Sequence, residues 1–166
     1  MQVSPSKELS PYIKHYLFLD NAETAVQKFR LFSDGNTGLV FSVKSKLISG
    51  INKYDVKDYL PSSFLYGQLN GYKDLYSENE ITLIIVVFQP NGIHQLLGIP
   101  ANEFHDSIIP VEDVFGKKAA KLQESLFQQN NQMRAELLNS FFKSLIINKT
   151  ASNQLLVNHS LNFITA

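Results

Sequence analysis

Hydrophobic and polar positions change their spacing about halfway along the chain. Before residue 90, apolar residues form short runs that are rich in β-branched and aromatic side chains and are separated by turn residues. Such runs are typical of strands. After residue 90, apolar residues recur every three or four positions, which predicts amphipathic helices. The pattern therefore predicts a sheet first and helices afterwards.

The first part is expected to hold roughly seven or eight short strands. The run at residues 81–88 is too continuous for a half-exposed strand, so we expect it to be buried, and Pro90 and Gly92 end it. No long crossover helix interrupts the strands, which favours an antiparallel barrel or sandwich. The expected strands are residues 12–20, 25–32, 38–43, 46–49, 63–69, 72–76 and 81–88.

The second part is expected to be helical. A short helix should begin after Asn91 and end at Gly98, because glycine accepts the left-handed conformation of a helix C-cap. A last helix capped by Ser152 reaches Ala166 without a stop signal, so we expect the sequence to be part of a longer protein. The other expected helices are residues 111–115, 117–129 and 132–148.

The helix at residues 132–148 carries two neighbouring apolar rows, which together make a wide stripe. A wide stripe needs two partners. Both can lie within the chain, or one can be the same helix of a second subunit, and the pattern leaves these alternatives open. The candidate residues for a homodimer interface are Met133, Leu137, Leu138, Phe141, Phe142 and Leu145.

Composition favours one domain over residues 1–166, with residues 1–90 mostly barrel and residues 91–166 helical. The chain has 166 residues, of which 44% are hydrophobic, enough for one well-filled core. Its net charge of zero lacks the positive field that nucleic-acid binding requires. The chain has no cysteine, and its N-terminus has no apolar signal or anchor segment. We therefore expect a cytoplasmic protein without membrane contact.

Several short motifs occur in a fixed order along residues 11–145. They are Asp34-Gly35, Leu39-Val40-Phe41, Phe88-x-Pro90-x-Gly92, Leu96-Leu97-Gly98-x-Pro100-Ala101-x-Glu103, Leu122 and Arg134. In order and spacing this series resembles the N-terminal sensor domain of AraC-type transcription regulators, and the block at residues 88–104 is its most specific part. One departure is Ser33, where the family usually has proline in a Pro-Asp-Gly turn.

The resemblance implies an α+β fold in which a cupin-like antiparallel β-barrel precedes C-terminal helices. It also implies that the barrel binds a small-molecule effector, that the helices form a homodimer, and that DNA is bound by a C-terminal helix-turn-helix domain which this chain lacks. A stand-alone cupin-like enzyme or small-molecule-binding barrel is the alternative.

Aromatic side chains on the expected strands are candidates to bind a small, partly apolar or sugar-like effector. Core packing is the commoner role of such side chains, and the pattern leaves both roles open. Arg30 can pair with an anionic effector or lie in solvent. The candidate effector-binding residues are Tyr16, Phe18, Phe29, Arg30, Phe41, Tyr66 and Phe88.

Catalysis finds no support in the sequence. A metal-dependent cupin needs two or three histidines and a carboxylate, commonly with a His-x-His step, and that step is absent. Only His15 falls on an expected barrel strand. The sequence also has no Gly-x-Ser-x-Gly elbow and no glycine-rich phosphate loop. We therefore expect no catalytic residue, no metal and no cofactor.

Overall fold

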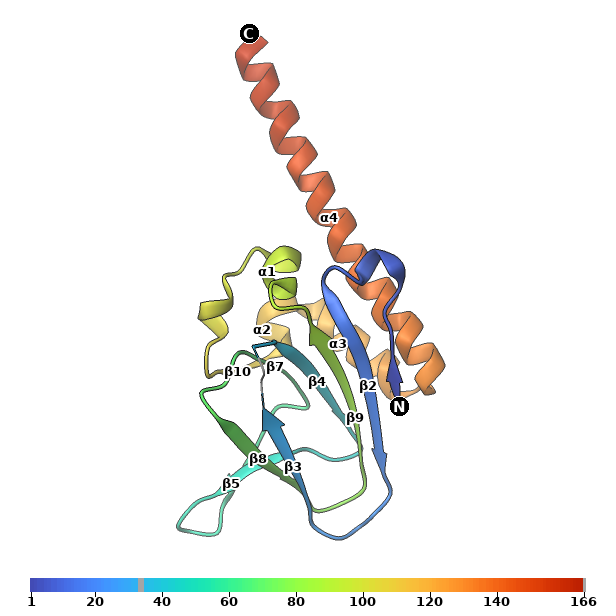
Figure 1. Cartoon of the computed structure of the whole chain (residues 1–166), viewed down its shortest axis with the longest axis vertical. Coiled ribbons are helices and arrows are strands. Elements are labelled where there is room, and N and C mark those ends of the chain that lie inside the picture. Colours follow the sequence, from blue (N-terminus) through green and yellow to red (C-terminus); the bar gives the residue numbers. More distant parts are fainter. Residues whose placement is uncertain (33–34, 166) are drawn as a thin grey trace.

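The computed structural model describes residues 1–32 and 35–165, so the predicted turn at Ser33 and Asp34 lies outside the described residues. Over the described residues the strands form two antiparallel sheets, of six and four strands. Helices follow, and the last of them leaves the body of the molecule (Figure 1). The α+β class, with a β-rich first part and helices after it, is confirmed.

The six-stranded sheet has the order β1-β2-β9-β4-β7-β10. Its central strand β4 is buried along its whole length, because both faces of the sheet are covered. A bulge between Ile13 and His15 places Ile13 on the same buried face as Tyr16 and Phe18. The strands are β1 (Gln2–Val3), β2 (Ile13–Asn21), β4 (Gly38–Val43), β7 (Ser63–Tyr66), β9 (Ile81–Phe88) and β10 (Ile108–Pro110).

The four-stranded sheet has the order β3-β8-β5-β6 and faces the larger sheet. Its strands are β3 (Gln27–Phe32), β5 (Ile48–Ile51), β6 (Lys57–Tyr59) and β8 (Tyr72–Ser77). The short edge strands β1 and β6 were not expected from the sequence. Neither was β10, which lies beyond residue 90 and pairs with β7, so the sheet extends into the part predicted to be helical.

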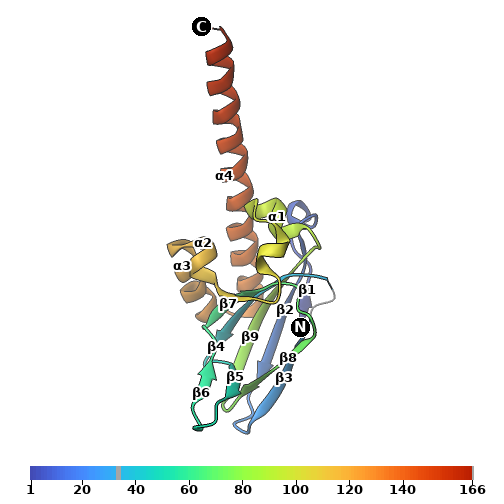
Figure 2. The ribbon, with the colours of Figure 1, turned by 90° about the vertical axis from the view of Figure 1, so that its left-hand side faces the viewer.

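The helices cover the face of the large sheet that points away from the small sheet (Figure 2). Gly98 ends the first of them in a left-handed conformation with φ 73°, as predicted. Asn91 occupies the N-cap position, but its side chain makes no cap hydrogen bond. The helices are α1 (Gly92–Leu97), α2 (Val111–Phe115), α3 (Lys117–Phe127) and α4 (Asn131–Thr165).

Helix α4 corrects one prediction. The sequence predicted a helix at residues 132–148 and a second helix capped by Ser152, whereas the backbone forms one continuous helix. No glycine or proline separates the two predicted helices, so nothing in the chain stops the first. The first half of α4 packs on the sheet, and its second half projects from the body (Figures 1 and 2). Over the described residues, no helix is long and apolar enough to cross a membrane.

The molecule has two hydrophobic cores, one on each face of the large sheet. Successive side chains of β4 point to opposite faces of the sheet, so this strand contributes to both cores. Leu39 and Phe41 face the helices, while Val40 faces the small sheet. In the helix-facing core, the ring of Phe142 on α4 meets that of Phe88 at 5.7 Å in an edge-on arrangement. The second core is smaller and contains the cavity described next.

Candidate functional site

A cavity of about 120 Å³ lies between the two sheets. Side-chain alternation explains its walls, because Phe29 and Leu31 of β3 point inward toward Val40 and Leu83 of the large sheet. Every residue in the wall is apolar except Arg30. The residues that line the cavity are Leu19, Phe29, Arg30, Leu31, Val40, Leu47, Phe64, Leu75, Leu83 and Ile85.

The lining residues differ in exposure, and this shows which side of the cavity is its buried floor and which is its opening to solvent. Val40, Phe64 and Leu75 are at most 3% exposed and form part of the floor. At the other side Leu19 is 37% exposed, and Phe29, like Leu31, is only partly buried. The cavity therefore opens to solvent between β2 and β3 and is closed at its far end.

The charge of Arg30 is held on the outer surface of the small sheet. Its Nε donates to Oδ1 of Asp74 at 2.9 Å, and a second guanidinium nitrogen donates to Oδ2 at 3.3 Å. The guanidinium also stacks over the ring of Tyr72 at 3.9 Å, and Lys28 reaches the same carboxylate at 2.8 Å. The hydrogen bond from Arg30, followed by that from Lys28, lowers the pKa of Asp74 to about 2. Arg30 is thus fixed by partners outside the cavity.

The structure separates the seven predicted effector-binding residues. Phe29 and Arg30 line the cavity, as part of one wall. Tyr66 belongs to the core between the sheets, but its ring covers Gly38, where an added Cβ would lie 2.2 Å from the ring. The other four are at most 1% exposed and pack on the opposite face of the sheet, against the helices: Tyr16, Phe18, Phe41 and Phe88. These four therefore do not line the cavity, and a role for them in effector binding stays a prediction.

Tyr16 fastens the sheet to α4. Its hydroxyl donates to Oδ1 of Asn139 at 2.8 Å, and the same oxygen accepts the backbone N–H of Ser6 at 3.1 Å. Burial raises the pKa of the Tyr16 hydroxyl, so it stays protonated and keeps donating. This tyrosine is a structural contact between β2 and the helix.

Sequence reasoning missed most of the cavity wall because it searched for aromatic residues. The wall is mainly aliphatic, and its aliphatic members lie on five different strands and, for Leu47, just before β5. The available signal was alternation: Leu19, Val40 and Leu83 occupy inward positions of predicted strands. That signal identifies an inner face, but it does not show that the face encloses a space.

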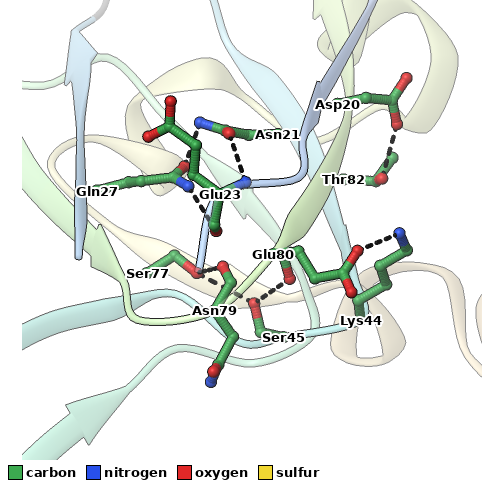
Figure 3. Close-up of polar contacts among 10 residues, drawn as sticks. All are labelled: Asp20, Asn21, Glu23, Gln27, Lys44, Ser45, Ser77, Asn79, Glu80 and Thr82. Atoms are coloured by element: carbon green, nitrogen blue, oxygen red, sulfur yellow. Dashed lines mark hydrogen bonds and ion pairs between the residues drawn. The ribbon is translucent and has the colours of Figure 1, made fainter. Parts of the chain in front are cut away.

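A polar network lies at the end of the two sheets at which β2, β4 and β8 finish (Figure 3). The Ser45 and Ser77 hydroxyls lie 3.0 Å apart, and Ser77 also donates to the carbonyl of Asn79 at 2.9 Å. Lys44 pairs with Glu80 at 2.7 Å. These contacts join the turns after β4 and β8 and satisfy their polar groups, which is a structural role.

A second hollow, of about 280 Å³, lies on the outside of this end. Its wall combines the exposed ring of Tyr59 with Ser45, Lys46, Glu78 and Asn79. Glu78 is already paired with Lys57 at 2.6 Å. Over the described residues, no group of three or more histidine, aspartate or glutamate residues is placed to hold a metal ion.

The predicted dimer-interface residues differ in how far they are buried within the chain. Leu138 and Phe142 are fully buried in the helix-facing core, so for them the alternative of packing within the chain holds. Leu137, Phe141 and Leu145 are partly buried against the same core, whereas Met133 is 41% exposed. Ile147, which the predicted set does not include, is 68% exposed where α4 leaves the body.

Comparison with known families gives one match. A family described as a domain of unknown function (DUF6597) matches residues 1–110, which span the chain from β1 to the end of β10. The match contains both sheets and the whole cavity wall, and it ends before α2. No curated protein matches the chain in sequence.

Proposed function

The chain belongs to the DUF6597 family, and we propose that it is the effector-sensing and dimerisation domain of an AraC-type transcription regulator. The motif order that resembles those regulators is the first support. In this proposal a C-terminal domain outside residues 1–166 binds DNA, which fits the net charge of zero. The proposal includes a cytoplasmic location, because a regulator has to reach its DNA.

The most specific motif occupies the junction between sheet and helices. Phe88 ends β9 inside the core, and Gly92 begins α1 where an added Cβ would lie 2.0 Å from the backbone oxygen of Tyr12. Only glycine allows this approach between the junction and the residue that precedes β2. The motif residues therefore have physical reasons for their identity, which strengthens the resemblance at the level of the fold.

The observation that carries the proposal is a cavity and a projecting helix in one molecule. The cavity lies on one face of the large sheet, and the first half of α4 packs on the other face. A ligand between the sheets and a partner on α4 would thus act on the same strands. This arrangement suits a sensor domain, in which ligand binding changes how two subunits associate.

Helix α4 offers a second subunit an uncharged stripe. Met133, Leu137, Ser140, Ser144 and Ile147 follow one another at alternating spacings of four and three, the spacing of a helix–helix seam. Among residues 147–166 only Lys149 carries a charge, if histidine is counted as neutral. A lone helix in water usually depends on many ion pairs, so this half of α4 favours a partner helix. The proposed partner is α4 of a second copy.

A route for communication joins the cavity to α4. Leu19 and Leu83 line the cavity, and their neighbours Asp20 and Thr82 are hydrogen-bonded at 2.7 Å on the opposite face (Figure 3). The other carboxylate oxygen of Asp20 accepts a long hydrogen bond, at 3.5 Å, from Asn131 in the first turn of α4. In the proposed mechanism, a ligand that moves β2 and β9 shifts the start of α4 through this contact.

A reporter fusion tests the proposal. Residues 1–166 replace the dimerisation domain of a DNA-binding domain that represses a reporter only as a dimer. The fusion is expected to repress, Ile147→Glu is expected to relieve repression by placing like charges in the seam, and Asn148→Glu on the same turn is the matched control that keeps it. Repression no stronger than that of the DNA-binding domain alone would contradict dimerisation.

A further inference from the structure

We propose that the cavity between the sheets binds a neutral, apolar molecule with about the bulk of one aromatic ring or a short branched alkyl group. The inference rests on the proposed function for its biological meaning, but the binding itself stands on the geometry of the cavity. It departs from the sequence-based expectation, which included sugar-like and anionic effectors.

The cavity wall is chemically suited to an apolar ligand. Nine of the ten lining side chains are Leu, Ile, Val or Phe, which have no hydrogen-bonding group. A sugar or a carboxylate entering this space would give up hydrogen bonds to water and gain none in return. An apolar molecule loses nothing by leaving water, and it gains contact with a wall whose floor is almost completely buried.

The partners of Arg30 argue against an anionic ligand. Its guanidinium is engaged by both oxygens of Asp74 and by the ring of Tyr72, on the outer side of β3 and β8. To meet an anion inside the cavity it would have to leave a carboxylate that it already binds with two hydrogen bonds. The aliphatic stem is the part of Arg30 suited to the wall.

The volume of the cavity limits the size of the ligand. A volume of about 120 Å³ is close to that of an engineered apolar cavity of about 150 Å³, which stays dry and binds benzene. It is well below the roughly 300–1,000 Å³ of pockets for drug-sized ligands, which excludes a nucleotide or a disaccharide as the enclosed group. The mouth beside Leu19 leaves room for a small polar substituent to stay in solvent.

The experiment compares three probes on the whole chain: toluene, benzoate and glucose. Toluene at about ten times its dissociation constant is expected to raise the melting temperature by roughly 3–6 °C, since a ligand of the native state stabilises it by mass action. Benzoate and glucose at the same concentration are expected to cause no shift. Ligand-observed NMR provides the dissociation constant independently.

Two substitutions locate the site. Val40→Phe fills the cavity from its floor and is expected to abolish the toluene shift. Val43→Phe on the same strand is the matched control, because Val43 faces the helix-facing core, and it is expected to retain the shift. If either phenylalanine prevents folding, Leu75→Ala serves instead: it enlarges the cavity and is expected to move the preference from toluene to naphthalene.

The outcomes separate this inference from the proposed function. A shift with benzoate or glucose but none with toluene would overturn the assignment of ligand class. A toluene shift that survives in folded Val40→Phe would place the ligand elsewhere and also overturn it. Toluene binding together with a reporter fusion that fails to repress would uphold the inference and count against the regulator, leaving a small-molecule-binding barrel.

Discussion

The hydrogen bond between Tyr16 and Asn139 predicts an asymmetric pair of substitutions. Tyr16→Phe removes the hydroxyl but leaves Asn139 with its second donor, the backbone N–H of Ser6 at 3.1 Å. Asn139→Ala leaves a buried hydroxyl and a backbone N–H without this partner. Because an unsatisfied buried group costs more than a lost hydrogen bond, the second change is expected to be the more harmful.

Tyr16→Phe should lower the free energy of unfolding by about 1 kcal/mol, and Asn139→Ala by about 2–3 kcal/mol. In the double variant the hydroxyl that would be stranded is already gone. The combined loss should therefore fall short of the sum by about 1 kcal/mol, which is the expected coupling between residues in one hydrogen-bonded group.

Urea unfolding at a fixed protein concentration measures all four members of this cycle, with the free energy obtained by linear extrapolation. The melting temperature gives a second readout, at roughly 2–4 °C per kcal/mol for a chain of this size. Losses that add to within about 0.3 kcal/mol would show that the two residues do not act together, and would refute the docking of α4 on β2 through this contact.

Three further substitutions test other parts of the structure. Gly92→Ala should lower the free energy of unfolding by about 1–3 kcal/mol, because it forces a Cβ against the backbone oxygen of Tyr12. Gly71 has open space around it, so Gly71→Ala should change the free energy of unfolding much less. Equal effects in urea unfolding would contradict the close approach at Gly92. Phe142→Ala should cost about 3–5 kcal/mol, since it empties a fully buried position, and a small loss would contradict its place in the core. Because the pKa of Asp74 is lowered, its ionised carboxylate stabilises the fold at pH values above the ordinary pKa of 3.8, and this contribution is lost as the pH falls through about 2. Asp74→Asn should remove this part of the acid sensitivity. A carboxyl NMR titration with a midpoint near pH 4 would refute the pairing with Arg30.

Local pattern was sufficient for much of the fold. The unbroken apolar run at residues 81–88 predicted a buried strand, and β9 is the strand to which both β2 and β4 pair. Gly98 marked the end of α1 through its backbone preference. Both predictions depend on residues that are neighbours in sequence, and this is why spacing and turn residues were enough.

The cavity and the role of α4 depend on contacts that spacing does not contain. Arg30 meets Asp74 across 44 positions of sequence, and only the pairing of β3 with β8 shows that the cation is already engaged. In the same way, two apolar rows on a helix look equivalent until one is placed on a sheet. The sheet covers Leu138 and Phe142, while Met133 and Ile147 remain exposed.

In the proposed mechanism, occupancy of the cavity and association of two chains are linked. Sedimentation equilibrium of the chain without and with saturating toluene measures this link directly, with saturation verified by the melting temperature. We predict a dimer whose dissociation constant changes at least about fivefold when toluene is bound, the lower end of ordinary coupling between two sites. A chain that stays monomeric throughout, or a dimer with the same dissociation constant in both conditions, would contradict the account.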